Sequence, residues 1–174
     1  MPSAKFFDAD QAAREVIELP EVRQQLLHEF GENIFGNGLN RDALRAIVFK
    51  DAAKKRALEQ ILHPPIRQQW QAVAETHRNS PDFFFADIPL LYETSGETLC
   101  DRVVVVACSS KIQLERLLER KSIDAKEAEE MIRSQMSLEE KIRRADHVVW
   151  NDGDRDGMME QAKMLVTLWT QTGH

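Results

Sequence analysis

The chain has 174 residues, of which 43% are hydrophobic and 30% charged, the composition of one ordinary globular domain over residues 1–174. Its 29 acidic and 23 basic residues give a net charge of −6, which argues against a general nucleic-acid-binding protein, since such proteins are usually basic. No apolar stretch approaches the roughly 20 residues of a membrane-spanning helix, and the N-terminus lacks the basic and apolar regions of a secretory signal. We therefore expect a cytoplasmic protein with neither a membrane nor a nucleic-acid partner.

Four short apolar runs have the length and composition of buried β-strands. They are residues 6–7, 83–88, 102–107 and 147–150. Stretches with helical periodicity lie between them. Strands that alternate with helices imply a parallel sheet with right-handed crossovers, so the sequence predicts an α/β fold.

The long segment between the first and second strands carries several helix signals. Pro20 interrupts the apolar pattern of residues 16–27, which predicts two short helices. Asn40 is placed to cap the next helix. A further amphipathic helix should end or kink near His63, because Pro64 disfavours helical geometry in the residue before it.

The junction between the first strand and the first helix carries two carboxylates and an arginine. Side chains alternate along a strand, so Asp8 and Asp10 can project toward the same side at its C-terminal end. Arg14 follows Asp10 at the i,i+4 spacing of a helix. Two interpretations remain open: these aspartates only cap the helix, or they serve phosphoryl transfer, in which a carboxylate accepts or orients a proton.

Three later segments follow this junction in a characteristic order. They are Ile-Leu-His-Pro at residues 61–64, Asp-Ile-Pro-Leu-Leu-Tyr-Glu at residues 87–93, and Ala-Asp-His-Val-Val-Trp-Asn-Asp-Gly at residues 145–153. From about Phe6 to the C-terminus, this pattern resembles the dephospho-CoA kinase family. The resemblance implies an α/β P-loop kinase fold in which helices flank a parallel sheet.

The resemblance implies transfer of the γ-phosphate of ATP, with Mg²⁺, to the 3′-hydroxyl of dephospho-CoA in the last step of coenzyme A biosynthesis. Asp10 would accept or orient the proton of the attacking hydroxyl. Asp8 would orient Asp10 or hold water on Mg²⁺, and Arg14 would keep the carboxylates ionised or touch substrate phosphate. Asp87 would lie behind the Mg²⁺ as a Walker-B-like carboxylate.

The resemblance also implies a helical insertion at about residues 20–65 that binds dephospho-CoA. Arg41, Phe49 and His63 are its candidate contacts, with Phe49 offering apolar surface to the pantetheine arm. Most of these side chains could equally belong to the core. His63 could be a structural residue at a helix end, and no histidine shows metal-ligand spacing.

A lid is implied at about residues 110–145. A planar guanidinium can contact two oxygens of the transferred phosphoryl group, so Arg116, Arg120 and Arg133 are the candidate catalytic residues. The alternative is a solvated helix face whose charges neighbouring glutamates balance. Lys141 would serve phosphate or only a helix end, and Asn151 would contact the nucleotide near the adenine.

The sequence contains no G-x-x-x-x-G-K-S/T phosphate loop, which the resemblance places before the two aspartates. In the resembled fold, the strand before this loop lies between the strands at 83–88 and 102–107, so we expect each of these to have an unpaired edge. The leading explanation is a truncated or misassigned start, with the N-terminal strand, loop and helix missing. The chain as given should be inactive.

Two other functions remain open. One is a non-catalytic CoA- or nucleotide-binding protein, and the other is a P-loop kinase for a different small metabolite. In each case we expect small-molecule partners and a monomer or weak oligomer.

Overall fold

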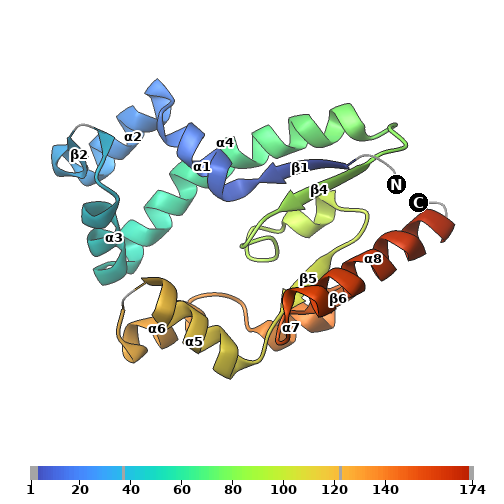
Figure 1. Cartoon of the computed structure of the whole chain (residues 1–174). Helices are drawn as coiled ribbons and strands as arrows, with labels where there is room; N and C mark the ends of the chain where they lie inside the picture. The colour runs from blue at the N-terminus through green and yellow to red at the C-terminus, as the bar shows by residue number, and fades with distance from the viewer. Residues whose placement is uncertain (1–3, 37, 122, 173–174) are drawn as a thin grey trace. The chain divides into compact units, whose positions relative to one another are not determined.

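The structure is a computed structural model that describes residues 4–36, 38–121 and 123–172. The chain forms two compact units, one up to Pro89 and one from Leu90 onward (Figure 1). Each unit contains a pair of parallel strands together with helices. The predicted α/β class is confirmed.

The first unit is built on a parallel strand pair. Its elements are β1 (Ala4–Asp8), α1 (Ala9–Ile17), α2 (Pro20–Phe30), η1 (Glu32–Ile34), β2 (Phe35–Gly36), β3 (Gly38–Leu39), α3 (Arg41–Lys50), α4 (Ala52–His77) and β4 (Phe83–Asp87). β1 and β4 pair in parallel, in a register that places Asp8 opposite Asp87. β2 and β3 form a short antiparallel hairpin. The carboxyl ends of β1 and β4 therefore meet at one edge, where ligands commonly bind in α/β folds.

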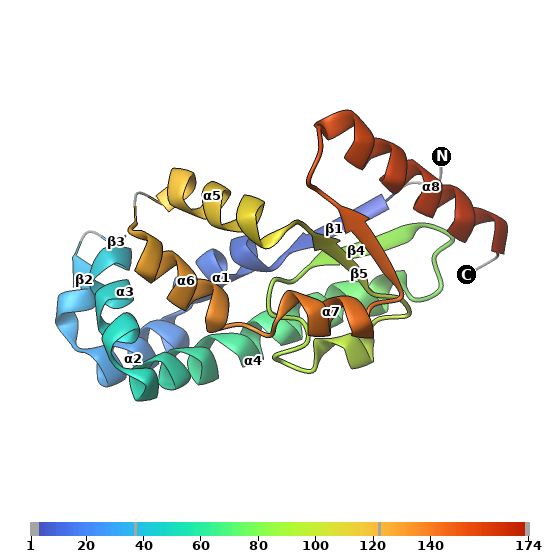
Figure 2. The same ribbon diagram turned by 90° about the horizontal axis from the view of Figure 1, so that it is seen from below.

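The two faces of the β1–β4 pair differ in their environment. α4 packs along one face (Figure 2), where His77 stacks on Phe84 with ring centroids 5.7 Å apart. On the other face, Phe6 stacks on Phe85 at 5.3 Å and is 72% exposed. Since alternate residues of a strand face opposite ways, one aromatic set is covered by a helix of this unit and the other is open.

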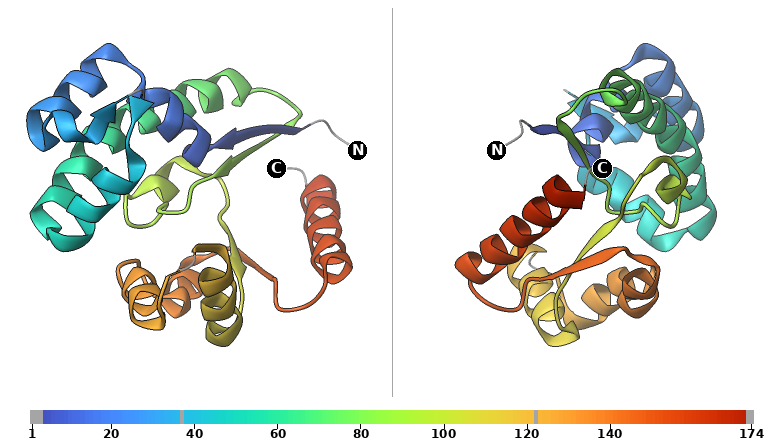
Figure 3. Two further views of the ribbon diagram at one scale, coloured as in Figure 1. Left: turned by 60° about the vertical axis from the view of Figure 1, so that its left-hand side comes forward. Right: turned by 90° about the vertical axis from the view of Figure 1, so that its right-hand side faces the viewer.

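The helices of the first unit lie close together (Figure 3). They enclose an apolar core around Val16, Leu26 and Ile34, which are fully buried. Pro20 begins α2, so the predicted division into two short helices is confirmed. Asn40 caps α3 as predicted, because its side-chain oxygen accepts a hydrogen bond from the backbone N–H of Ala43 at 3.0 Å.

The sequence predicted that the helix ends or kinks near His63, and the first of these two outcomes is wrong. α4 continues through Pro64 and Pro65 as far as His77. Each proline removes one intrahelical hydrogen bond. However, the apolar side chains on either side, including Ile61 and Ile66, pack against the core of the first unit. Tertiary packing therefore outweighs the local cost of the prolines.

The second unit is built on another parallel pair. Its elements are η2 (Gly96–Leu99), β5 (Val104–Ala107), α5 (Ser110–Lys121), α6 (Ala125–Arg133), α7 (Leu138–Arg144), β6 (His147–Trp150) and α8 (Arg155–Thr172). β5 and β6 run in parallel, and their core includes Tyr92, Val105 and Ala107. α8 packs on β6, where the indole N–H of Trp169 donates to Nε2 of His147 at 3.1 Å.

β4 and β5 each have one edge that no described strand pairs with, as expected. Among the described residues, β4 pairs only with β1, and β5 pairs only with β6. One edge of each therefore presents backbone N–H and C=O groups that no strand of the described chain satisfies.

Candidate active site

Two carboxylates lie side by side at the carboxyl edge of the first unit. Asp8 and Asp87 are the last register pair of β1 and β4, and both are exposed. Oδ1 of Asp8 accepts hydrogen bonds from the backbone N–H groups of Asp10 and Gln11, at 2.8 and 3.0 Å. Asp8 is therefore the N-cap of α1, and the capping interpretation is confirmed for this residue.

Asp10 lies in the first turn of α1 and is exposed. Its carboxylate has no hydrogen bond or ion pair within the described part of the chain, and neither has Arg14, which lies in the last turn of the same helix. The i,i+4 pair between them, which the spacing allows, is not formed. Both side chains are available to a ligand.

The carboxyl edge can assist a magnesium ion but does not form a metal centre by itself. In residues 4–36, 38–121 and 123–172, no three His, Cys, Asp or Glu side chains come close enough to hold a metal ion. Mg²⁺ typically takes one or two protein carboxylates and completes its shell with water and substrate phosphates. The exposed Asp8, Asp10 and Asp87 fit that supporting role.

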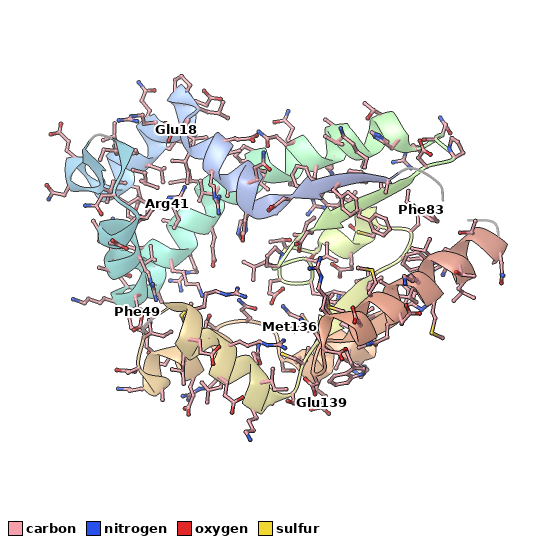
Figure 4. The ribbon with its side chains drawn as sticks, viewed as in Figure 1. Glu18, Arg41, Phe49, Phe83, Met136 and Glu139 are labelled. Atoms are coloured by element: carbon pink, nitrogen blue, oxygen red, sulfur yellow. The ribbon has the colours of Figure 1, made fainter. Side chains whose placement is uncertain are left out.

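The expected acceptor contacts are spread over α3 and α4. Arg41 is the first residue of α3, and Phe49 lies near its other end (Figure 4). Phe49 is 48% exposed, so the interpretation that it belongs to the core is wrong. His63 is partly buried in the middle of α4 and not at a helix end.

In the second unit, the structure brings together two of the predicted residues, Arg116 and Asn151. Nη1 of Arg116 donates a 2.8 Å hydrogen bond to the backbone carbonyl of Asn151. Arg116 is partly buried and has no carboxylate partner among the described residues. A half-buried positive charge without a counter-ion is a ready site for an anionic ligand.

The other two lid arginines have different surroundings. Arg133 forms an ion pair of 3.2 Å with Glu129 of its own helix, and its side chain is 70% exposed. This arrangement matches the solvated helix face. Arg120 is exposed and has no ion pair in the described residues. Of the three arginines, Arg116 is the one whose guanidinium is held by another part of the fold.

Lys141 takes part in an ionic contact that the sequence did not reveal. Its Nζ lies 3.0 Å from Oε1 of Glu93, with side chains 15% and 22% exposed, respectively. The same Glu93 oxygen accepts a 2.9 Å hydrogen bond from the backbone N–H of Met136. Burial raises the pKa of Glu93, but the hydrogen bonds from Lys141 and Met136 outweigh it and hold this pKa below its ordinary value.

A second pair follows one turn further along the same two segments. Arg144 donates to Glu97, and its guanidinium carbon lies 4.4 Å from the ring centroid of Tyr92. Burial raises the pKa of Tyr92, which Arg144 partly opposes. The sequence places Lys141 and Arg144 one turn apart on a helix, but it does not show that the two glutamates meet them.

The turn after β6 is tied to the start of the lid by further contacts. The backbone N–H of Asn151 donates to the carbonyl of Ala107 at 2.7 Å. The Asp152 carboxylate accepts a hydrogen bond from the Ser109 N–H at 2.6 Å. Sequence reasoning missed Asp152, because nothing in an Asn-Asp-Gly turn shows which distant amide its carboxylate will meet.

Comparison with known proteins connects this geometry to a family. The family model described as dephospho-CoA kinase (CoaE) matches residues 3–156. The chain belongs to the dephospho-CoA kinase family. A dephospho-CoA kinase of Symbiobacterium thermophilum is 37% identical over 167 residues, which cover 93% of this chain and 70% of the relative. One of Bacillus cereus is 36% identical over 171 residues, which cover 96% of this chain and 86% of the relative.

Solved structures share the fold of this chain. The chain is similar to the crystal structure of TT1252 from Thermus thermophilus, with a TM-score of 0.75, 29% identity, and coverage of 94% of this chain and 84% of the other. It also shares the fold of a dephospho-CoA kinase from Campylobacter jejuni, with a TM-score of 0.69, 24% identity, and coverage of 97% and 86%, respectively. Among the described helices, none is long and apolar enough to cross a membrane.

Proposed function

We propose that this chain acts as a dephospho-CoA kinase, in which ATP phosphorylates the 3′-hydroxyl of dephospho-CoA, once a phosphate loop is supplied. Family membership over most of the chain supports the reaction. The observation that carries the chemistry is the exposed Asp10, which has no partner among the described residues and lies at the carboxyl edge where Asp8 and Asp87 meet. This edge is where α/β folds bind their ligands. We also propose a cytoplasmic location, because the reaction draws on the ATP pool.

We assign Asp10 to accept or orient the proton of the attacking hydroxyl. A carboxylate that is not committed to a neighbour can accept or orient that proton as the oxygen attacks phosphorus. Asp8 serves by holding the first turn of α1 through its cap, which fixes the backbone of Asp10. Mg²⁺, when bound with ATP, would neutralise charge that develops on the phosphates, and we assign Asp87 to assist it.

The residues of the second unit are assigned to the nucleotide. Arg116 keeps its Nε and Nη2 groups without partners in the described structure, so it can bind two phosphate oxygens while the Asn151 carbonyl holds Nη1. Arg120 and Arg133 are weaker candidates because both are exposed. We assign Arg41 and Phe49 to the acceptor, and Arg14 and His63 to supporting contacts with it. We assign Lys141 to a phosphate contact that it makes while its ion pair with Glu93 keeps the side chain in place.

The sequence lacks the loop whose backbone N–H groups and lysine cradle ATP phosphates. We therefore expect no turnover from the 174-residue chain. A fusion that adds a strand, a phosphate loop and a helix before residue 1, roughly 20–30 residues, should restore it. The assay is ATP-dependent 3′-phosphorylation of dephospho-CoA, followed by chromatography of the products, with a panel of other small acceptors to test a different metabolite kinase.

Asp10→Asn in that fusion is the decisive variant. The amide keeps the shape of the side chain but loses the proton acceptor, so turnover should fall at least 100-fold while ATP binding persists. Near-normal turnover in this variant would remove Asp10 from the mechanism.

The alternative function is that of a non-catalytic protein that binds dephospho-CoA, for which the exposed Phe49 of α3 offers an apolar contact. Calorimetric titration of the 174-residue chain with dephospho-CoA, together with the activity of the fusion, separates the two. Tight acceptor binding with an inactive fusion would favour the binding protein.

A further inference from the structure

We propose that Glu93 and Asp152 are positioning residues that hold the two ends of the helix pair α5–α6, and so orient the arginines on it. The inference rests on the proposed function, because these arginines matter only if they meet a phosphate. Both carboxylates accept a hydrogen bond from a backbone N–H beside the pair, at Ser109 before α5 and at Met136 after α6.

The anchor before α5 is the better connected of the two. Asp152 binds the N–H of Ser109, whose carbonyl accepts the first helical hydrogen bond of α5 from Gln113 at 2.9 Å. The neighbouring Asn151 contributes two more contacts, its N–H to the Ala107 carbonyl and its carbonyl to Arg116. The start of α5 is therefore fixed to the turn after β6 at the backbone and through one arginine.

The anchor after α6 involves one carboxylate and two donors. Glu93 binds the N–H of Met136, three residues beyond the end of α6, and the same oxygen binds Lys141 on α7 (Figure 4 labels Met136). The Glu93 side chain is only 22% exposed, and hydrogen bonds that involve a charged, poorly hydrated group are stronger than neutral ones. This anchor joins the end of α6 to the segment before η2.

Between the anchors, α5 and α6 pack on each other, and Ala128 of α6 is fully buried. A packed helix pair moves as one body, and its movement requires dihedral changes in the links at its two ends. Both links carry a charge-assisted bond on a backbone amide. Removal of either carboxylate should free one link and change how Arg116 is held, without disturbing the β5–β6 pair.

Amide hydrogen exchange of the full 174-residue chain, read residue by residue with NMR, tests the inference. Asp152→Ala should speed exchange about tenfold at Ser109 and the first turn of α5, the effect of losing one charge-assisted bond, with β6 amides unchanged. Glu93→Ala should do the same at Met136. Asp152→Ala should also shift the guanidinium resonances of Arg116, which a loss of overall stability alone would not do.

Asp124→Ala is the matched control. Asp124 caps α6 by accepting the N–H of Glu127 at 2.8 Å, so its removal deletes the same kind of bond inside the helix pair and should leave Ser109, Met136 and Arg116 unchanged. Asp152→Asn and Glu93→Gln keep an oxygen acceptor without the charge. Each should show a smaller acceleration, about two- to threefold, at the same amides, even if an alanine variant does not fold.

Uniform acceleration across residues 90–172, or no change at the anchored amides, would overturn the inference and leave the proposed reaction untouched. Conversely, an inactive phosphate-loop fusion combined with the expected exchange pattern would refute the reaction and keep the anchors. In an active fusion, Asp152→Ala should raise the KM for ATP more than Asp124→Ala does.

Discussion

A stability measurement can distinguish the roles of Asp8 and Asp10, because the structure gives the two carboxylates different contacts. Asp8 accepts two backbone hydrogen bonds at the start of α1, whereas Asp10 accepts none from the described residues. Loss of an N-cap costs about 1 kcal/mol, within a range of about 0.5–2. For a chain of this size, that loss lowers the melting temperature by about 2–4 °C. We expect this from Asp8→Ala.

The matched variants isolate the cap from the charge. Asp8→Asn keeps the acceptor oxygen, so it should retain most of the stability. Asp10→Asn loses only an interaction with the helix dipole, which salt screens. In about 1 M NaCl, Asp8→Ala should therefore be the one variant of the three with a lower melting temperature. Circular dichroism during heating measures this temperature. An equal drop in Asp10→Asn, or no drop in Asp8→Ala, would show that the assignment of the cap is wrong.

Two further predictions concern the second unit. The pKa of Glu93 lies below its ordinary value of 4.5, so the carboxylate's contribution to stability is present above pH 4.5 and is lost as the pH falls through the lower, folded-state pKa. Glu93→Gln should remove this loss of stability in acid. Melting curves recorded between pH 7 and 3 test the prediction. A Cβ on Gly96 would lie 2.8 Å from Cδ1 and 3.2 Å from the carbonyl oxygen of Leu91, so Gly96→Ala should destabilise by about 1–3 kcal/mol in urea unfolding. Gly153→Ala is its control, because no described atom beyond the adjacent residues would lie within 4 Å of the added Cβ. Equal effects of the two changes would contradict the steric argument.

Local patterns in the sequence were enough to predict the four strands of the parallel pairs, the division of the first helices at Pro20 and the cap at Asn40, but not the short β2–β3 hairpin. Each depends on residues a few positions apart, and the physics that decides them acts over the same short distance. The ordered motifs also pointed to the dephospho-CoA kinase family, which the comparisons show. The strand boundaries shifted only slightly, with β1 extending over Ala4–Asp8 and β5 beginning at Val104.

Tertiary structure decided the features that join distant segments. The helix persists past Pro64 because side chains on α4 pack against a core that local propensity cannot foresee. The bond from Arg116 to Asn151 and the contact of Glu93 with Lys141 join residues 35 and 48 positions apart, respectively. A charged residue shows in the sequence that it needs a partner or solvent, but only the folded chain determines which partner it meets, because burial and distance set the energy of the contact.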